Sequence, residues 1–154
     1  MNRSMRFSWG ALALAPLPIP VIYSAAFVLL TPGRNLAFGF VVFAAIGAAF
    51  TYGATALLLL PCLYALSRAV RLNAAWAGAV GAVLGFALDL LELRISWGAS
   101  GVDSGPPSET FAHYMARNFW GIELPVFVGA GLATALLYWW LAGRGPRGTG
   151  TSPA

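Results

Sequence analysis

Four uncharged apolar stretches constrain this chain more than any other feature of its sequence. They cover Ser8–Gly33, Asn35–Ser67, Leu72–Leu88 and Leu124–Gly143. A helix needs about 20 apolar residues to cross the hydrocarbon core of a bilayer. The first, second and fourth stretches are long enough, and the third reaches that length only by including Asp89. We therefore expect an all-α integral membrane protein, folded as a bundle of four transmembrane helices.

The composition agrees with this class. Of the 154 residues, 59% are hydrophobic and only 9% are charged, which is too little charged surface for a water-soluble domain of this size. We expect a single membrane domain over residues 1–154, surrounded by lipid. The net charge of +4 comes from arginines that lie singly or in pairs beside the ends of the apolar stretches, so it does not indicate nucleic-acid binding.

The positions of the arginines predict a topology. We expect spans at about residues 10–31, 36–66, 74–95 and 122–142, an outer loop over 96–121 and a tail over 143–154. Six arginines then share one side of the membrane: Arg3, Arg6, Arg68, Arg71, Arg144 and Arg147. The positive-inside rule assigns this side, both termini and the tail to the cytoplasm. The expected location is the cytoplasmic (inner) membrane of a bacterium, and all six tryptophans fall at proposed span ends, as the rule for interfacial aromatic residues requires.

Two spans are irregular. Pro16, Pro18 and Pro20 remove backbone donors from the first span, which indicates either a kinked helix packed on its neighbours or a broken helix that exposes backbone. The second span is longer than the bilayer core, so we expect it to tilt, to kink at Pro61 or to project into the cytoplasm. A turn at Thr51–Gly53 between two short spans is the alternative.

The outer loop carries a predicted amphipathic helix between spans 3 and 4. Ser108 can cap it, with Glu109 in the first turn. Phe111, Tyr114, Met115 and Phe119 form one face, and Glu109, His113 and Arg117 form the other at intervals of four residues. This pattern is typical of a helix that lies on the membrane surface.

A stripe of small and acidic residues runs along one face of span 3. It consists of Gly78, Gly81, Gly85, Asp89, Glu92 and Ser96, spaced by three or four residues. The glycines allow a second helix to approach closely, so we expect this face to lie inside the bundle. On span 4 we expect Gly129 and Ala133, together with Gly131, to make close helix contacts.

The acidic end of this stripe is the candidate polar site. It comprises Asp89, Glu92, Arg94, Arg117 and Glu123. A charge at this depth requires a partner or water. We expect an ion-pair latch in which Arg94, Arg117 or a helix end pairs with the acids and fixes the bundle. A proton- or cation-binding site and a catalytic acid are the alternatives.

The sequence favours a function without catalysis. His113 is the only histidine, and no spacing typical of metal ligands surrounds it, so we expect no metal and no other cofactor. We also find no nucleotide-binding or hydrolase motif. The expectation is a small multi-pass protein that acts by helix packing, as an accessory subunit or with a homo-oligomeric partner. The alternative is a small proton- or cation-coupled transporter or channel that uses Asp89 and Glu92.

Overall fold

The computed structural model describes residues 8–30, 35–70, 72–99, 109–118, 121 and 123–143, and within these ranges it is all-helical. Four helical segments are long and apolar enough to cross a membrane: Trp9–Leu30, Leu36–Ala69, Ala74–Ala99 and Glu123–Gly143. Each segment begins and ends within four residues of the bounds expected for its span. The prediction of four membrane-length helices is therefore confirmed.

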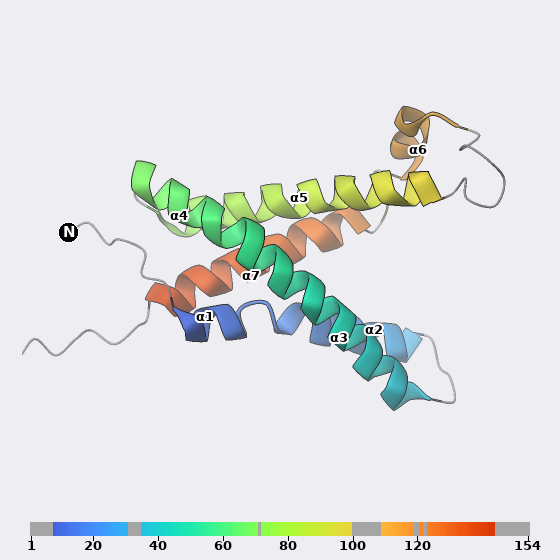
Figure 1. The fold of residues 1–154 in the computed structure, drawn as a ribbon, viewed down its shortest axis with the longest axis horizontal. Helices are drawn as coiled ribbons and strands as arrows, with labels where there is room; N and C mark the ends of the chain where they lie inside the picture. The colour runs from blue at the N-terminus through green and yellow to red at the C-terminus, as the bar shows by residue number, and fades with distance from the viewer. Residues whose placement is uncertain are drawn as a thin grey trace, which may run out of the picture.

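The topology arginines lie mostly outside the described residues. Arg68 is described, whereas Arg3, Arg6, Arg71, Arg144 and Arg147 are not, and neither is the tail after Gly143. The described helices nevertheless alternate in direction, as Figure 1 shows. The start of the first segment, the connection at 69–74 and the end of the fourth segment lie at one end of the molecule.

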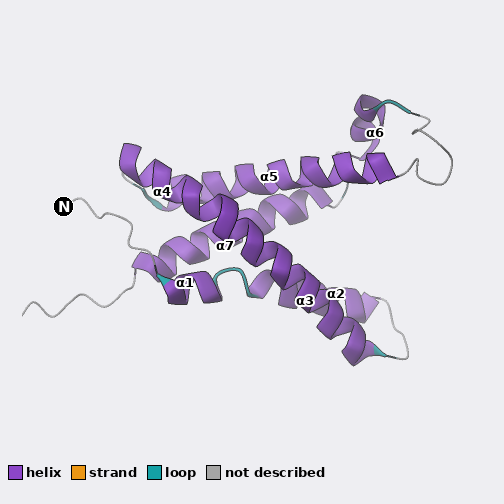
Figure 2. Cartoon of the chain, in the orientation of Figure 1, coloured by secondary structure: helices purple, strands orange, loops and turns teal. Residues whose placement is uncertain are grey.

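The first segment is broken in two. Helix α1 (Trp9–Leu14) and helix α2 (Pro18–Leu30) are joined by a short loop over Ala15–Leu17, which Figure 2 shows in teal. The break follows from the closely spaced prolines, which cannot donate backbone hydrogen bonds. The hydroxyl of Tyr52 donates to the carbonyl group of Ala13, which would bond to Leu17 in an unbroken helix. The break is thus packed, and a side chain from the next segment satisfies one of its carbonyl groups.

The second segment is continuous and contains a π-helical turn. Helix α3 (Leu36–Ala54) passes through the π-turn (Thr55–Leu59) into helix α4 (Leu60–Ala69). Pro61 explains the turn, because its ring clashes with the carbonyl group four residues earlier and it has no N–H for that carbonyl. The segment's 34 residues extend over about 51 Å. The turn considered at Thr51–Gly53 does not occur, since helix α3 runs through it.

The helices form two pairs that converge at one end. Helix α5 (Ala74–Ala99) packs along helix α7 (Glu123–Gly143), and α2 packs on α3. The buried core lies where the pairs meet, at the end where α1 begins and α7 ends. It joins α1, the π-turn, α4, α5 and α7 through Ala11, Ala15, Leu59, Leu63, Ala77, Ala135 and Tyr138. At the other end the α2–α3 pair diverges from the α5–α7 pair (Figure 1). Helix α3 itself has no buried residue.

A short helix, α6 (Phe111–Asn118), lies between α5 and α7 in the chain. Its cap differs from the expected one: the hydroxyl of Thr110 accepts from the amide of His113 at 3.4 Å, and Ser108 lies outside the described residues. Phe111, Tyr114 and Met115 lie on its half-buried face, while His113 and Arg117 are exposed. This arrangement follows the predicted amphipathic pattern. Phe119 lies outside the described residues.

Candidate functional site

The closest helix contact in the molecule joins α5 to α7 through glycine. A Cβ atom added to Gly81 would lie 2.6 Å from the Cβ of Ala135, and closer still to the carbonyl oxygen of Gly131. A Cβ added to Gly85 would lie 2.9 Å from the carbonyl carbon of Phe127. The two backbones therefore touch, which only glycine permits. This contact fixes which face of α5 looks towards α7.

The other residues predicted for this packing differ in their roles. Gly78 is buried, but a Cβ there would meet only flexible side chains, those of Leu136 at 3.5 Å and Leu132 at 4.0 Å. Gly129 is exposed and has nothing within 4 Å of an added Cβ, and Ala133 is half-buried. Of the two α7 glycines expected to make close contacts, Gly131 meets Gly81 and Gly85 of α5, whereas Gly129 does not. Two residues turn a helix by about 200°, so Gly129 lies on the opposite side of α7 from Gly131.

Asp89 lies one turn beyond Gly85 on the face that packs against α7. Its side chain is 1% exposed, and its Oδ2 atom has no hydrogen-bond partner among the described residues. The antiparallel register of Gly81 with Gly131 and of Gly85 with Phe127 brings Asp89 opposite the first residues of α7, at Glu123. The carboxyl group is thus enclosed between two helices at the end of their contact.

Glu92 continues the polar face towards the end of α5. It is half-buried, and its Oε1 atom accepts a hydrogen bond of 2.5 Å from the hydroxyl of Ser96. Its Oε2 atom is buried and has no partner among the described residues. Glu123, at the first position of α7, is exposed, where the positive end of the helix dipole favours an acid.

The two arginines expected to pair with these acids bind elsewhere. The guanidinium carbon of Arg94 lies 4.3 Å from the ring centre of Trp97 and 5.3 Å from that of Phe111. Arg117 donates to the Oε1 atom of Glu109 at 2.7 Å. No ion pair within 4.0 Å joins either arginine to Asp89 or Glu92 in the described part of the chain.

Among the described residues, neither arginine therefore pairs with these acids, and for Arg94 the reason is geometric. Arg94 follows Asp89 by five residues, which turns its side chain about 140° around the helix and away from α7. It is exposed, and two aromatic rings cover its cation instead.

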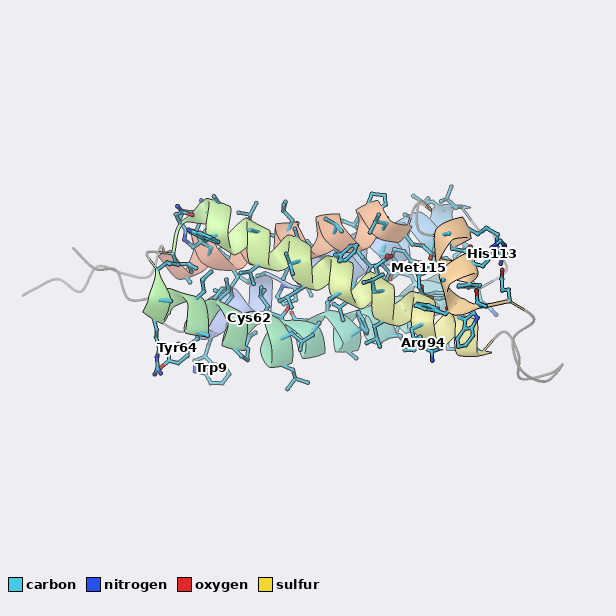
Figure 3. The ribbon with its side chains drawn as sticks, turned by 90° about the horizontal axis from the view of Figure 1, so that it is seen from above. Trp9, Cys62, Tyr64, Arg94, His113 and Met115 are labelled. Atoms are coloured by element: carbon cyan, nitrogen blue, oxygen red, sulfur yellow. The ribbon has the colours of Figure 1, made fainter. Side chains whose placement is uncertain are left out.

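Sequence reasoning missed the residues that attach α6 to α5. The indole N–H of Trp97 donates to the carbonyl group of Glu109 at 3.0 Å, and its ring meets Phe111 edge-on at 5.8 Å between centres. With Arg94 they form a cluster that we call the α6 anchor: Arg94, Trp97, Glu109 and Phe111. Figure 3 shows Arg94 and His113 at this end of the molecule, with Trp9 and Tyr64 at the other. The signal available was a tryptophan at a helix end, which predicts an interfacial ring but not its partner.

Neither a set of metal ligands nor a groove lined by Asp89 is found among the described residues around the site. The described residues contain no group of three or more His, Cys, Asp or Glu side chains placed to hold a metal ion. An open groove of about 490 Å³ lies nearby, lined by Phe86, Gly121, Leu124, Pro125 and Val128. None of these side chains is charged, and Asp89 does not line the groove. Among the described residues, the site offers one buried carboxyl group, that of Asp89, and one half-buried carboxyl group, that of Glu92.

Comparison of this chain with family models, with curated proteins and with solved structures gives no match. Its function therefore has to be inferred from its own residues.

Proposed function

We propose that this chain is a small multi-pass membrane protein that acts by helix contact, as an accessory subunit of a membrane complex or with a second copy of itself, without catalysis. The observation that carries the proposal is the exposure of α3. Helix α3 packs on α2 through Phe43 and Gly47, and it has no buried residue along its 19 positions. Small-residue helices gain stability in a bilayer by close packing against another helix.

The side of α3 turned away from α2 is the surface we assign to the partner. Helical periodicity places Phe38, Val41, Ala45 and Ala49 there, and all four are exposed. Two of these residues are small and are spaced by four, which suits close contact with another helix. The divergence of the two helix pairs at this end adds to the uncovered surface (Figure 1).

Purification from the native membrane tests the contact role. The intact chain is cross-linked in the membrane, extracted in mild detergent and analysed for co-purifying chains by mass. Ala45→Phe should abolish the complex without changing the stability of the isolated chain. Val83→Phe is the matched control, because Val83 is 65% exposed on α5. An uncomplexed wild-type chain, or equal complex formation by both variants, would contradict the proposal.

The proposed orientation puts both termini in the cytoplasm, and the proposed compartment is the inner membrane of a bacterium. The support is the arginine distribution in the sequence and the alternating direction of the four described helical segments. A reporter that is active only on the outer side of the membrane, fused after Ala154, should be silent. Strong activity of that fusion would reverse the topology, and α6 would then lie on the cytoplasmic side.

A second candidate function is proton- or cation-coupled transport through Asp89 and Glu92. The specific observation in its favour is that Asp89 is buried and that no described arginine forms an ion pair with it. Ionisable groups inside membrane helices commonly belong to ion pathways. Purified protein in vesicles with a trapped pH indicator should show proton flux that Asp89→Asn removes and Glu123→Gln keeps. Absence of flux in the wild-type vesicles would exclude proton transport by this chain alone.

A further inference from the structure

We propose that Asp89 is a proton-binding site, held in its neutral form between α5 and α7, and that Glu92 and Ser96 connect it to the end of the helix pair that carries α6. This deepens the second candidate function by naming the proton as the ion. Proton occupancy does not require transport, so the two can be tested separately.

The first step is the enclosure of the Asp89 side chain. Gly85, one turn away on the same face, has its backbone against Phe127 and Val128 of α7. Asp89 continues this face and is 1% exposed, and its Oδ2 atom has no partner among the described residues. An ionised carboxylate without a partner is far more costly in such surroundings than a neutral carboxyl group. The neutral form therefore fits the enclosure.

The second step concerns the charged groups that face Asp89 from each neighbouring element. On α5 itself the nearest titratable group is Glu92, and Arg94 points to the α6 anchor. On α7 the group in register is Glu123, another acid. The π-turn contacts α5 and contains no titratable side chain.

The charged side chains of α6 and of the residues just before it either form ion pairs with one another or are exposed. Glu109 binds Arg117 at 2.7 Å, and His113, 73% exposed, lies 3.8 Å from the other oxygen of Glu109. The described surroundings of Asp89 thus hold acids and no available cationic side chain. These acids favour a bound proton over an ionised carboxylate, and they act against the positive end of the α7 dipole at Glu123.

The third step separates a proton from a metal ion. Hard cations require several oxygen ligands arranged around them. The described residues contain no group of three ligating side chains, and Asp89 does not line the nearby groove. A proton needs only one oxygen atom, which Oδ2 of Asp89 provides.

The fourth step is the connection to water. Asp89, Glu92 and Ser96 follow one another by three and four residues, so they lie on one face over about 10 Å. The hydroxyl of Ser96 donates to Glu92, and both residues are half-buried. A proton from water at the helix end can protonate the Glu92 carboxylate and then move to Asp89. The second transfer leaves Asp89 as the acid and Glu92 as the carboxylate.

Infrared spectroscopy of the full chain in vesicles of neutral phosphatidylcholine tests the proposal. The chain contains two aspartates, Asp89 and Asp103, so aspartate labelled with carbon-13 in its carboxyl group reports on few sites. At neutral pH the wild type should show the carbonyl stretch of a protonated carboxylic acid, and the label should shift it. Asp89→Asn should lose this band, and Asp103→Asn should keep it.

The controls give each outcome a meaning. Glu92→Gln should keep the Asp89 band and slow its exchange with heavy water, because the connection is interrupted. Added sodium chloride should leave the band in place. A wild-type protein without the band, a band that the label does not shift, or a band that sodium removes would overturn the proposal. The labelled wild type decides the matter even if Asp89→Asn does not fold, and it does so whether or not the vesicles show proton flux.

Discussion

Replacing Gly85 with alanine tests the contact on which the geometry of Asp89 depends. The added Cβ would lie 2.9 Å from the carbonyl carbon of Phe127 and 3.0 Å from the Cα of Val128. Non-bonded carbon atoms prefer about 3.5–4.0 Å, so α5 and α7 would have to separate by about 0.5–1 Å. A gap of this size forfeits about a quarter to a half of the dispersion attraction between the atoms concerned.

The expected cost can be worked out from this clash. Overpacking of a tight contact costs about 1–3 kcal/mol. The atoms that are met belong to backbone and cannot rotate away, so the upper half of this range applies. Replacing a helical glycine with alanine returns about 0.5–1 kcal/mol. Gly85→Ala should therefore lower the free energy of unfolding by about 1–2.5 kcal/mol.

Two other glycines provide graded controls for this prediction. Gly129→Ala meets nothing within 4 Å and should raise the free energy of unfolding by about 0.5–1 kcal/mol. The Cβ added by Gly78→Ala meets only movable leucine side chains, so the stability of this variant should fall between those of the other two. The assay is unfolding of the three variants in one detergent, followed by circular dichroism. Equal stability of Gly85→Ala and Gly129→Ala would refute the backbone contact.

Three further outcomes are expected. Tyr52→Phe leaves a carbonyl group in the first span without its hydroxyl donor and should cost about 1–2 kcal/mol in detergent unfolding, whereas Tyr23→Phe should cost nothing. Trp97→Phe keeps a ring but loses the indole donor, so the amides of α6 should exchange with heavy water faster; unchanged exchange would mean that the bond does not hold α6. Asp89→Asn and Arg94→Gln should have effects on the free energy of unfolding that add within about 0.5 kcal/mol. An interaction energy above about 1 kcal/mol in this double-mutant cycle would show that the two side chains pair after all.

Periodicity made the helices and one packing face predictable. Four long apolar runs define the four segments, and the regular spacing of Gly81, Gly85 and Asp89 on α5 identifies the face that meets α7. Both predictions use the fixed rotation per residue of a helix, so the spacing of residues in the sequence is enough to make them.

The remaining parts of the site depend on partners that a sequence does not specify. Helix α7 carries small residues on every side, so spacing alone could not select Gly131 over Gly129. Arg94 is near Asp89 in the sequence, but its cation lies over Trp97. The three prolines indicated an irregular first span, whereas the hydroxyl group that bonds there comes from Tyr52, on the next segment.

The π-turn keeps one row of side chains of the second segment on the buried side of the helix. Thr55, Leu59 and Leu63 are buried, and they are spaced by exact fours. In a regular helix of 3.6 residues per turn, every fourth residue moves about 40° around the axis, so such a row would wind away from its partners. The wider turn at Thr55–Leu59 opposes this drift and keeps the row facing the core. Deleting one residue of the turn would rotate α4 by about 100° and expose Leu63 to lipid, while α3 would keep its contact with α2.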